Sequence, residues 1–153
     1  MTESVRAFVA VELPPHVGDT LSGLVRFLDG ERVRGLRTVA PDAVHLTLKF
    51  LGNIPVAQLD AVAAAMKESG EDTTPFSLSI HGLGAFPGLS APQVLWAGVQ
   101  GDLTPLLLMQ IRLEESLAAR GFRKEGRPFS PHLTLARVRG KLSPADIQHL
   151  VAA

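Results

Sequence analysis

The sequence predicts an α+β fold with two lobes related by approximate internal symmetry. Apolar, β-branched runs alternate along the chain with segments whose apolar residues recur at helical spacing. The tetrapeptide His-Leu-Thr-Leu occurs twice, at His45–Leu48 and at His132–Leu135. Both copies follow a proline-containing segment and begin an apolar run. Alternating elements together with a repeated motif favour two small antiparallel sheets flanked by helices around a shared central cleft.

Each half of the predicted duplication contains a strand, a helix, a basic loop and a His-x-Thr strand. The halves cover approximately residues 5–52 and 93–139. Two copies of so long a unit favour a single two-lobed domain over 1–153 rather than a solenoid, which needs about three or more repeats.

The elements of the first half follow from apolar spacing and from proline and glycine stop signals. Pro14 stops the first strand, and Gly30 is the expected end of the following helix. The expected elements are a strand over Ala7–Val11, a helix from Pro15 to about Leu28, and a strand over Val44–Leu51.

The middle of the chain predicts a helix, a strand and a loop. The helix covers Pro55–Lys67, and the strand covers Phe76–Ile80 with period-2 alternation. Glycine and proline residues then predict a loop over Gly82–Pro92.

The second half repeats the order of the first. The expected elements are a strand over Val94–Val99, a helix over Leu103–Ala119, the second His-x-Thr strand from His132 through Val138, and a last helix from Ser143 through Leu150.

Composition excludes several classes of protein. The 153 residues are 46% apolar, carry no net formal charge and include no cysteine. Disulfide scaffolds, thiolate metal sites and a cysteine nucleophile are therefore excluded. No stretch reaches the ~18 apolar residues of a membrane span, and the N-terminus lacks the features of a signal peptide. We expect a cytoplasmic protein with no membrane contact and no obligate protein partner.

The repeated motif predicts a site with paired histidine and threonine side chains. Alternate residues of a strand share a face, so His45 points with Thr47, and His132 points with Thr134. One imidazole can deprotonate water while another protonates a leaving alkoxide. Threonine hydroxyls can hold the non-bridging oxygens of a phosphodiester. These four side chains suit hydrolysis of a phosphodiester without a metal or other cofactor.

Metal catalysis is the main chemical alternative, because histidine is also a common zinc ligand. Asp42 lies three residues before His45, but Phe129 occupies the matching place before His132. The symmetry therefore supplies no matching carboxylate ligand. The remaining histidines, His16, His81 and His149, are interpreted as structural or surface residues.

Four segments resemble the RNA 2′,3′-cyclic phosphodiesterases, also called 2′-5′ RNA ligase-like proteins, of the two-histidine phosphoesterase superfamily. The resemblance runs from about residue 5 to residue 139. The segments are Arg6–Pro14, His45–Gly52, Gly82–Pro87 and Arg127–Arg137.

The resemblance implies a bilobal two-histidine phosphoesterase fold and hydrolysis of RNA 2′,3′-cyclic phosphate ends, or of related cyclic nucleotides, to 2′-phosphates. It implies that His45 donates a proton to the departing 3′ oxygen and that His132 activates water as the proton acceptor. Thr47 and Thr134 would hold the phosphate oxygens. The residues themselves are symmetric and leave the assignment of acid and base open.

Two further residues are weaker candidates for substrate binding. Arg137 resembles a family position near the phosphate, but strict alternation puts it on the opposite face from His132, so a strand end or bulge is needed. Phe8 could stack on a base, although a buried position in its strand is the favoured interpretation. Basic residues in the loops before the two motif strands could attract RNA phosphates. They are Arg32, Arg34 and Arg37, and Arg123, Lys124 and Arg127.

Two alternatives to hydrolysis stay open on the sequence. One is 2′-5′ RNA ligation, which is the same reaction in reverse. The other is a non-catalytic RNA-binding module, against which both intact histidines argue. Members of the family usually continue beyond the last helix with further strands, whereas this chain stops at Ala153. A shortened variant and an incomplete chain are both compatible with that ending.

Overall fold

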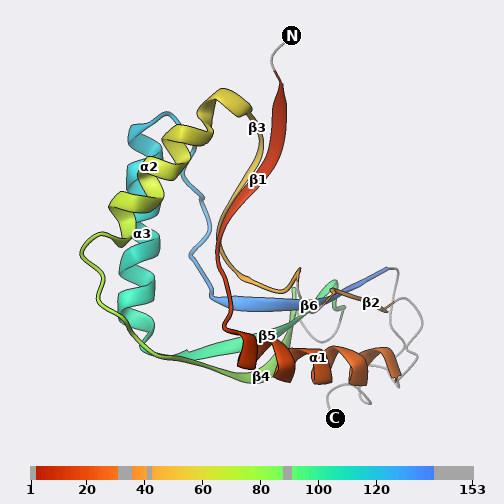
Figure 1. Ribbon diagram of the computed structural model, residues 1–153. Coiled ribbons are helices and arrows are strands. Elements are labelled where there is room, and N and C mark those ends of the chain that lie inside the picture. Colours follow the sequence, from red (N-terminus) through yellow and green to blue (C-terminus); the bar gives the residue numbers. More distant parts are fainter. Residues whose placement is uncertain (1–2, 31–35, 41–42, 88–90, 140–153) are drawn as a thin grey trace. The chain divides into compact units, whose positions relative to one another are not determined.

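The computed structural model describes residues 3–30, 36–40, 43–87 and 91–139 (Figure 1). The prediction of an α+β fold is confirmed, with helices and mainly antiparallel strand pairs in the described residues. The chain divides into two compact units, each assembled from three separate segments. The first unit contains residues 1–11, 47–79 and 100–131, and the second contains 12–46, 80–99 and the chain from His132 onward.

The first unit combines two long strands with two helices. Strand β1 (Ser4–Val11) is the neighbour of β3 (Leu46–Pro55), and the two run alongside each other in Figure 1. A short 3-10 turn leads into α2 (Leu59–Gly70), which packs against α3 (Leu103–Ala119). Apolar side chains spaced along the two helices form the buried core. They are Val62 and Ala65 from α2, and Leu106, Leu113 and Leu117 from α3.

Polar contacts on the surface also join α2 to α3. The guanidinium of Arg120 donates to Glu68 Oε1 at 2.7 Å, and the Ser116 hydroxyl donates to Glu68 Oε2 at 2.6 Å. These donors favour the ionised carboxylate, so they lower the pKa of Glu68 from 4.5 to about 2.

In the second unit, several strands pair with one central strand. Strand β6 (His132–Val138) lies between β3 and β5 (Val94–Gly101), and β5 neighbours β4 (Leu78–Phe86). The three-residue strand β2 (Leu36–Thr38) also pairs antiparallel with β6. Helix α1 (Pro15–Gly30) contributes buried apolar side chains to this unit. The buried residues here include Leu21, Val25, Leu46, Leu95, Ala97, Leu133 and Leu135.

The predicted loop over Gly82–Pro92 is wrong for its first five residues, which belong to β4. Glycine serves a packing purpose in this strand. A Cβ on Gly84 would lie 2.3 Å from the indole of Trp96, so only glycine leaves room for that ring against β4. His81 accordingly lies inside β4.

Other differences concern the ends of elements. Strand β1 begins at Ser4 instead of Ala7, and the helix expected from Pro55 begins at Leu59 after the 3-10 turn. Strand β2 was not predicted, because three residues are too few to show a period. The last predicted helix, from Ser143 through Leu150, lies outside the described residues. Among the described residues, no helix combines the length and apolar character needed to cross a bilayer.

Candidate active site

The second His-x-Thr strand has the alternation that the sequence predicts. In β6, His132 and Thr134 are half-buried, whereas Leu133 and Leu135 are almost completely buried. The leucines therefore hold the strand in the core, and the histidine and threonine point to the other side.

The first motif joins this strand through its leucine. Leu46 is the Cα partner of Leu133 in the antiparallel pairing of β3 with β6. His45 directly precedes Leu46, and Thr134 directly follows Leu133, so both lie one residue away from this pair. His45, His132, Thr134 and Arg137 all belong to the second unit. Thr47 is half-buried in β3 and belongs, like Phe8, to the first unit.

Two aromatic rings surround His132. The ring of Phe86 meets the imidazole edge-on at a centroid distance of 5.0 Å, and the Trp96 ring lies 6.4 Å away. Phe86 and Trp96 also contact each other at 5.4 Å. On the neighbouring strand, Gly98 is the Cα partner of His132. These contacts restrict the orientations open to the imidazole.

A β-bulge brings Arg137 to the same face as the motif. Thr134 pairs with Trp96, and Arg137 pairs with Val94. Arg137 is three positions after Thr134 in β6, whereas Val94 is only two positions before Trp96 in β5. The extra residue makes Leu135 and Ala136 consecutive buried positions. Because Trp96 and Val94 share a face of β5, Thr134 and Arg137 share a face of β6. The β-bulge that Arg137 needs in order to share a face with His132 is therefore present.

The sequence predicts that Arg37 lies in a basic loop, but this residue lies in strand β2. It is the Cα partner of Arg137, and both side chains are exposed. Residues directly opposite in an antiparallel pair point to the same side of the sheet. Arg37 therefore extends the face that carries Thr134 and Arg137. A three-residue strand left no periodic signal from which this pairing could be predicted.

Phe8 is exposed, so the favoured interpretation of a buried strand residue is wrong. Its side chain is 46% exposed and contacts Phe50, which is 68% exposed. The ring centroids are 6.1 Å apart, and the ring planes are inclined by 47°. Both residues belong to the first unit, where they form an exposed aromatic surface.

Phe50 was not predicted as a site residue, although the repeat contained a signal for it. Phe50 lies five residues after His45, just as Arg137 lies five residues after His132. The two strands also share one burial pattern, with two consecutive buried residues before the exposed fifth one. The repeat therefore extends beyond the tetrapeptide to the exposed residue of each strand.

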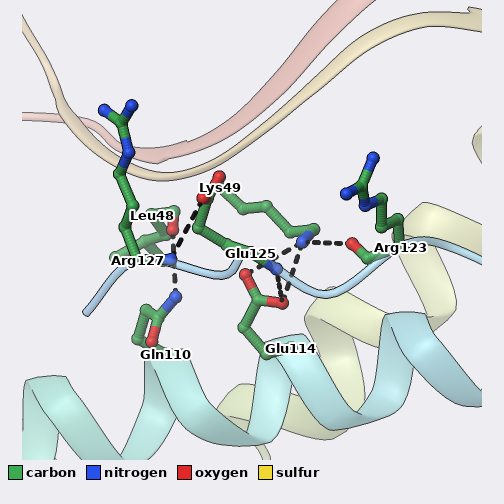
Figure 2. A network of polar contacts seen from close by, with 7 residues as sticks. All are labelled: Leu48, Lys49, Gln110, Glu114, Arg123, Glu125 and Arg127. Carbon is green, nitrogen blue, oxygen red and sulfur yellow. Dashed lines mark hydrogen bonds and ion pairs between the residues drawn. The ribbon is translucent and has the colours of Figure 1, made fainter. Parts of the chain in front are cut away.

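A buried ion pair holds the segment that leads toward the second motif (Figure 2). The ammonium group of Lys49 donates to both oxygens of Glu114 at 2.8 and 2.9 Å and to the carbonyl of Arg123 at 2.8 Å. The backbone N–H of Glu125 donates to the same carboxylate at 3.2 Å. Lys49 retains only 7% exposure, so its charge is neutralised inside the first unit.

The basic side chains of this segment remain at the surface. Arg123, Lys124 and Arg127 are exposed, and Figure 2 shows the Arg123 and Arg127 side chains directed away from the ion pair. A groove in the first unit is lined by Lys49–Gly52 and Phe122–Gly126. Its exposed cations are suited to attract an anionic polymer.

The fold and these strand pairings define a phosphoesterase with paired His-x-Thr motifs, and sequence comparison agrees. The chain belongs to the LigT-like phosphoesterase family, which matches residues 11–96 and 101–153. It is 34% identical over 139 residues to an RNA 2′,3′-cyclic phosphodiesterase of Archaeoglobus fulgidus, covering 90% of this chain and 74% of that protein.

Solved structures give the same result. The crystal structure of TT0787 of Thermus thermophilus superimposes with a TM-score of 0.74 at 31% identity, covering 91% of this chain and 77% of that one. E. coli LigT complexed with 3′-AMP superimposes with a TM-score of 0.69 at 26% identity, covering 93% and 76% of the two chains.

Proposed function

We propose that this protein hydrolyses RNA 2′,3′-cyclic phosphate ends to 2′-phosphates, using a pair of histidines and no metal. Membership of the LigT-like family and the similarity to an RNA 2′,3′-cyclic phosphodiesterase support the reaction class. The complex of E. coli LigT with 3′-AMP supports a nucleotide substrate. The observation that carries the proposal is the pairing of Leu46 with Leu133, because it joins the two His-x-Thr motifs in neighbouring strands.

The reaction is a displacement at phosphorus. His132 accepts a proton from water, whose oxygen forms a bond to phosphorus. The bond from phosphorus to the 3′ oxygen breaks, and His45 donates a proton to that oxygen as it leaves. The product carries a 2′-phosphate and a free 3′ hydroxyl. The rings of Phe86 and Trp96 would keep the His132 imidazole directed at the water.

The remaining site residues bind and position the substrate. Thr47 and Thr134 donate hydrogen bonds to the non-bridging oxygens, where negative charge develops. Arg137, brought to this face by the bulge, adds a charged donor for phosphate. Phe8 and Phe50 offer exposed rings on which the terminal base can stack.

The test uses an oligoribonucleotide with a 2′,3′-cyclic end, incubated with the purified protein in excess chelator. We expect conversion to the 2′-phosphate, which His45→Ala and His132→Ala should each reduce by at least about 10²-fold. His16→Ala is the matched control, since His16 is exposed on α1 in the same unit. It should retain wild-type activity.

The same assay separates the competing functions. A product joined through a new phosphodiester bond would identify a ligase, and RNA binding without turnover would identify a binding module. Activity that needs added metal, or that survives both histidine substitutions, would contradict the proposal. The dependence of kcat/KM on pH should be bell-shaped, because one histidine must be neutral and the other protonated.

A further inference from the structure

The groove of the first unit combines exposed cations with aromatic rings. It is lined by Lys49–Gly52 of β3 and by Phe122–Gly126 after α3, and its volume is about 470 Å³. Arg123 and Lys124 in this lining are exposed, and the side chain of Phe50 is 68% exposed. Proteins that bind single-stranded nucleic acid without sequence preference combine a cationic groove for the backbone with aromatic rings for the bases.

The charges of the lining favour an anionic occupant. Lys49 is neutralised by Glu114, so this ion pair adds no net charge to the groove. Glu125 supplies a carboxylate to the lining, and one of its oxygens accepts a hydrogen bond from a backbone N–H two residues further along the chain. The exposed Arg123 and Lys124 outweigh this carboxylate and leave the lining net positive. A row of phosphates along a nucleic acid strand is an anion that such a groove attracts.

The buried ion pair also fixes the backbone that carries these cations (Figure 2). The ammonium group of Lys49 donates to the carbonyl of Arg123 at 2.8 Å, and the Glu114 carboxylate accepts from the backbone N–H of Glu125 at 3.2 Å. The chain is thus anchored on both sides of Lys124. Anchoring of this kind reduces the entropy that the segment loses when a ligand binds.

The groove shares a residue with the proposed site for the RNA end. Phe50 belongs to the aromatic pair on which the terminal base is proposed to stack, and it also lines the groove. Thr47, proposed to hold a phosphate oxygen, lies three residues earlier in the same strand, which corresponds to about 10 Å. An RNA strand whose last nucleotide occupies these residues would have its preceding nucleotides within reach of the groove.

We propose that this groove binds the single-stranded RNA that precedes the cyclic end, with Arg123 and Lys124 contacting its phosphates. The ion pair of Lys49 with Glu114 positions both cations. The assignment rests on the proposed function and adds its substrate class, because cyclic mononucleotides lack the preceding phosphodiesters. The bases must be unpaired in order to stack on an exposed ring. Arg123 and Lys124 bind the chain in this scheme and take no part in proton transfer.

The experiment compares a cyclic-ended oligoribonucleotide with a 2′,3′-cyclic mononucleotide as substrates of Arg123→Gln/Lys124→Gln. We expect kcat/KM for the oligoribonucleotide to fall by about 10-fold, mainly through a higher KM, because exposed charge contacts are lost. Turnover of the mononucleotide, which makes no such contacts, should change less than about twofold. The variant keeps the carbonyl of residue 123 that Lys49 contacts, so its thermal midpoint should equal that of the wild type.

Lys67→Gln/Arg112→Gln is the matched control, because it removes the same charges from exposed positions on α2 and α3 of the same unit. It should affect neither substrate. The slope of log affinity against log salt for the oligoribonucleotide should become shallower by about 1.4 in Arg123→Gln/Lys124→Gln, at about 0.7 for each phosphate contact with a single strand. The control should keep the wild-type slope.

The double variant Lys49→Met/Glu114→Leu tests the anchoring of the cations. It keeps Arg123 and Lys124 but removes both side chains that hold their backbone. We expect its affinity for the oligoribonucleotide to fall by about 3- to 10-fold, because side chains that are no longer preorganised must be ordered on binding. Its turnover of the mononucleotide should stay within about twofold of wild type, which a general loss of structure would not allow. Wild-type affinity for the oligoribonucleotide would overturn the anchoring.

Three results would overturn binding of the RNA strand in the groove. Equal losses on both substrates in Arg123→Gln/Lys124→Gln would assign these cations to the cyclic phosphate. No loss on either substrate would remove them from the RNA site. A blunt RNA duplex that binds as tightly as the single strand would exclude stacking of unpaired bases.

Binding of a 3′-phosphorylated oligoribonucleotide, measured by fluorescence anisotropy, gives a readout independent of catalysis. If the wild-type protein turns over neither substrate, the proposed function fails. A selective loss of oligoribonucleotide binding in Arg123→Gln/Lys124→Gln would still support the groove in that case.

Discussion

At the scale of single residues, Thr134 lies next to the leucine pair that joins the two motifs. It lies on the half-buried side of β6, next to Leu133, which pairs with Leu46 of β3. Its neighbours Leu133 and Leu135 are buried on the other side. Changes to the Thr134 hydroxyl can therefore be made without opening the core.

Thr134→Val should lower kcat by about 10²-fold, because it removes one hydrogen-bond donor to a developing negative charge. Valine has nearly the same shape, so the thermal midpoint should change little. Thr134→Ser, which keeps the hydroxyl, should retain most of the activity. Single-turnover kinetics on the cyclic-ended oligoribonucleotide provide the measurement. Equal activity of the valine and serine variants would remove Thr134 from the site.

Individual site residues were predictable where the signal was local, and unpredictable where it depended on pairing. The alternation in β6 followed from the sequence. The position of Arg137 did not, because an extra residue in a strand changes the face of every residue after it. The exposure of Phe8 likewise depends on which elements cover β1, and a single strand carries no information about that.

At the scale of elements, Lys49 joins β3 to α3 and to the segment that follows this helix. Its ammonium group contacts the Glu114 carboxylate and the Arg123 carbonyl. A buried pair of this kind contributes little net stability compared with apolar residues, but breaking it leaves one charge without a partner.

Lys49→Met should lower the free energy of unfolding by about 3 kcal/mol, because the largely buried Glu114 carboxylate would lose its ion-pair partner. The double variant Lys49→Met/Glu114→Leu should recover most of this loss. Lys67→Met, at an exposed position on α2, is the control and should have almost no effect. Urea denaturation followed by circular dichroism measures all three. A double variant less stable than Lys49→Met would contradict this explanation.

The contact of α2 with α3 should make stability depend on pH in the acid range. The pKa of Glu68 is lowered to about 2 in the folded protein, so its stabilising contribution is complete above about pH 4.5 and is lost as the pH falls to about 2. The Glu68→Gln variant lacks this contribution. The difference in urea midpoint between wild type and variant should therefore shrink from pH 5 to pH 2. Glu71→Gln, which changes the carboxylate just after the same helix, is the matched control.

Elements with a long periodic signal were predicted best. The helix over Leu103–Ala119 and the strand over His132–Val138 agree with the structure at both ends. Strand β4 was predicted too short because its glycines indicated a loop. Glycine is also found where a neighbouring ring or backbone approaches closely, as Trp96 does at Gly84. The sequence alone does not distinguish these two uses of glycine.

At the scale of the whole molecule, neither compact unit is a continuous piece of chain. The first unit needs α3 from the second half of the sequence, and the second unit needs α1 and β2 from the first half. The α+β class was predictable from the order of elements, but this exchange of segments was not. Contacts between distant segments leave no trace in local periodicity.

Separating the chain after Ser79 should therefore destroy both units. We expect fragments 1–79 and 80–153 to lack a cooperative thermal transition in circular dichroism, whereas the full chain should show one. Each fragment lacks strands or helices that supply buried leucines to its unit. A fragment that unfolds cooperatively on its own would contradict this prediction.

The burial pattern shared by β3 and β6 has a consequence for the exposed residue that ends each copy of the motif. Counted from each histidine, the repeated segment is six residues long and ends at an exposed side chain, Phe50 in one copy and Arg137 in the other. One copy thus carries an aromatic ring and the other a cation at equivalent places. A nucleotide is itself a flat ring joined to an anion. Under the proposed function, the fifth position after each histidine would supply a chemically matched partner for one part of a nucleotide.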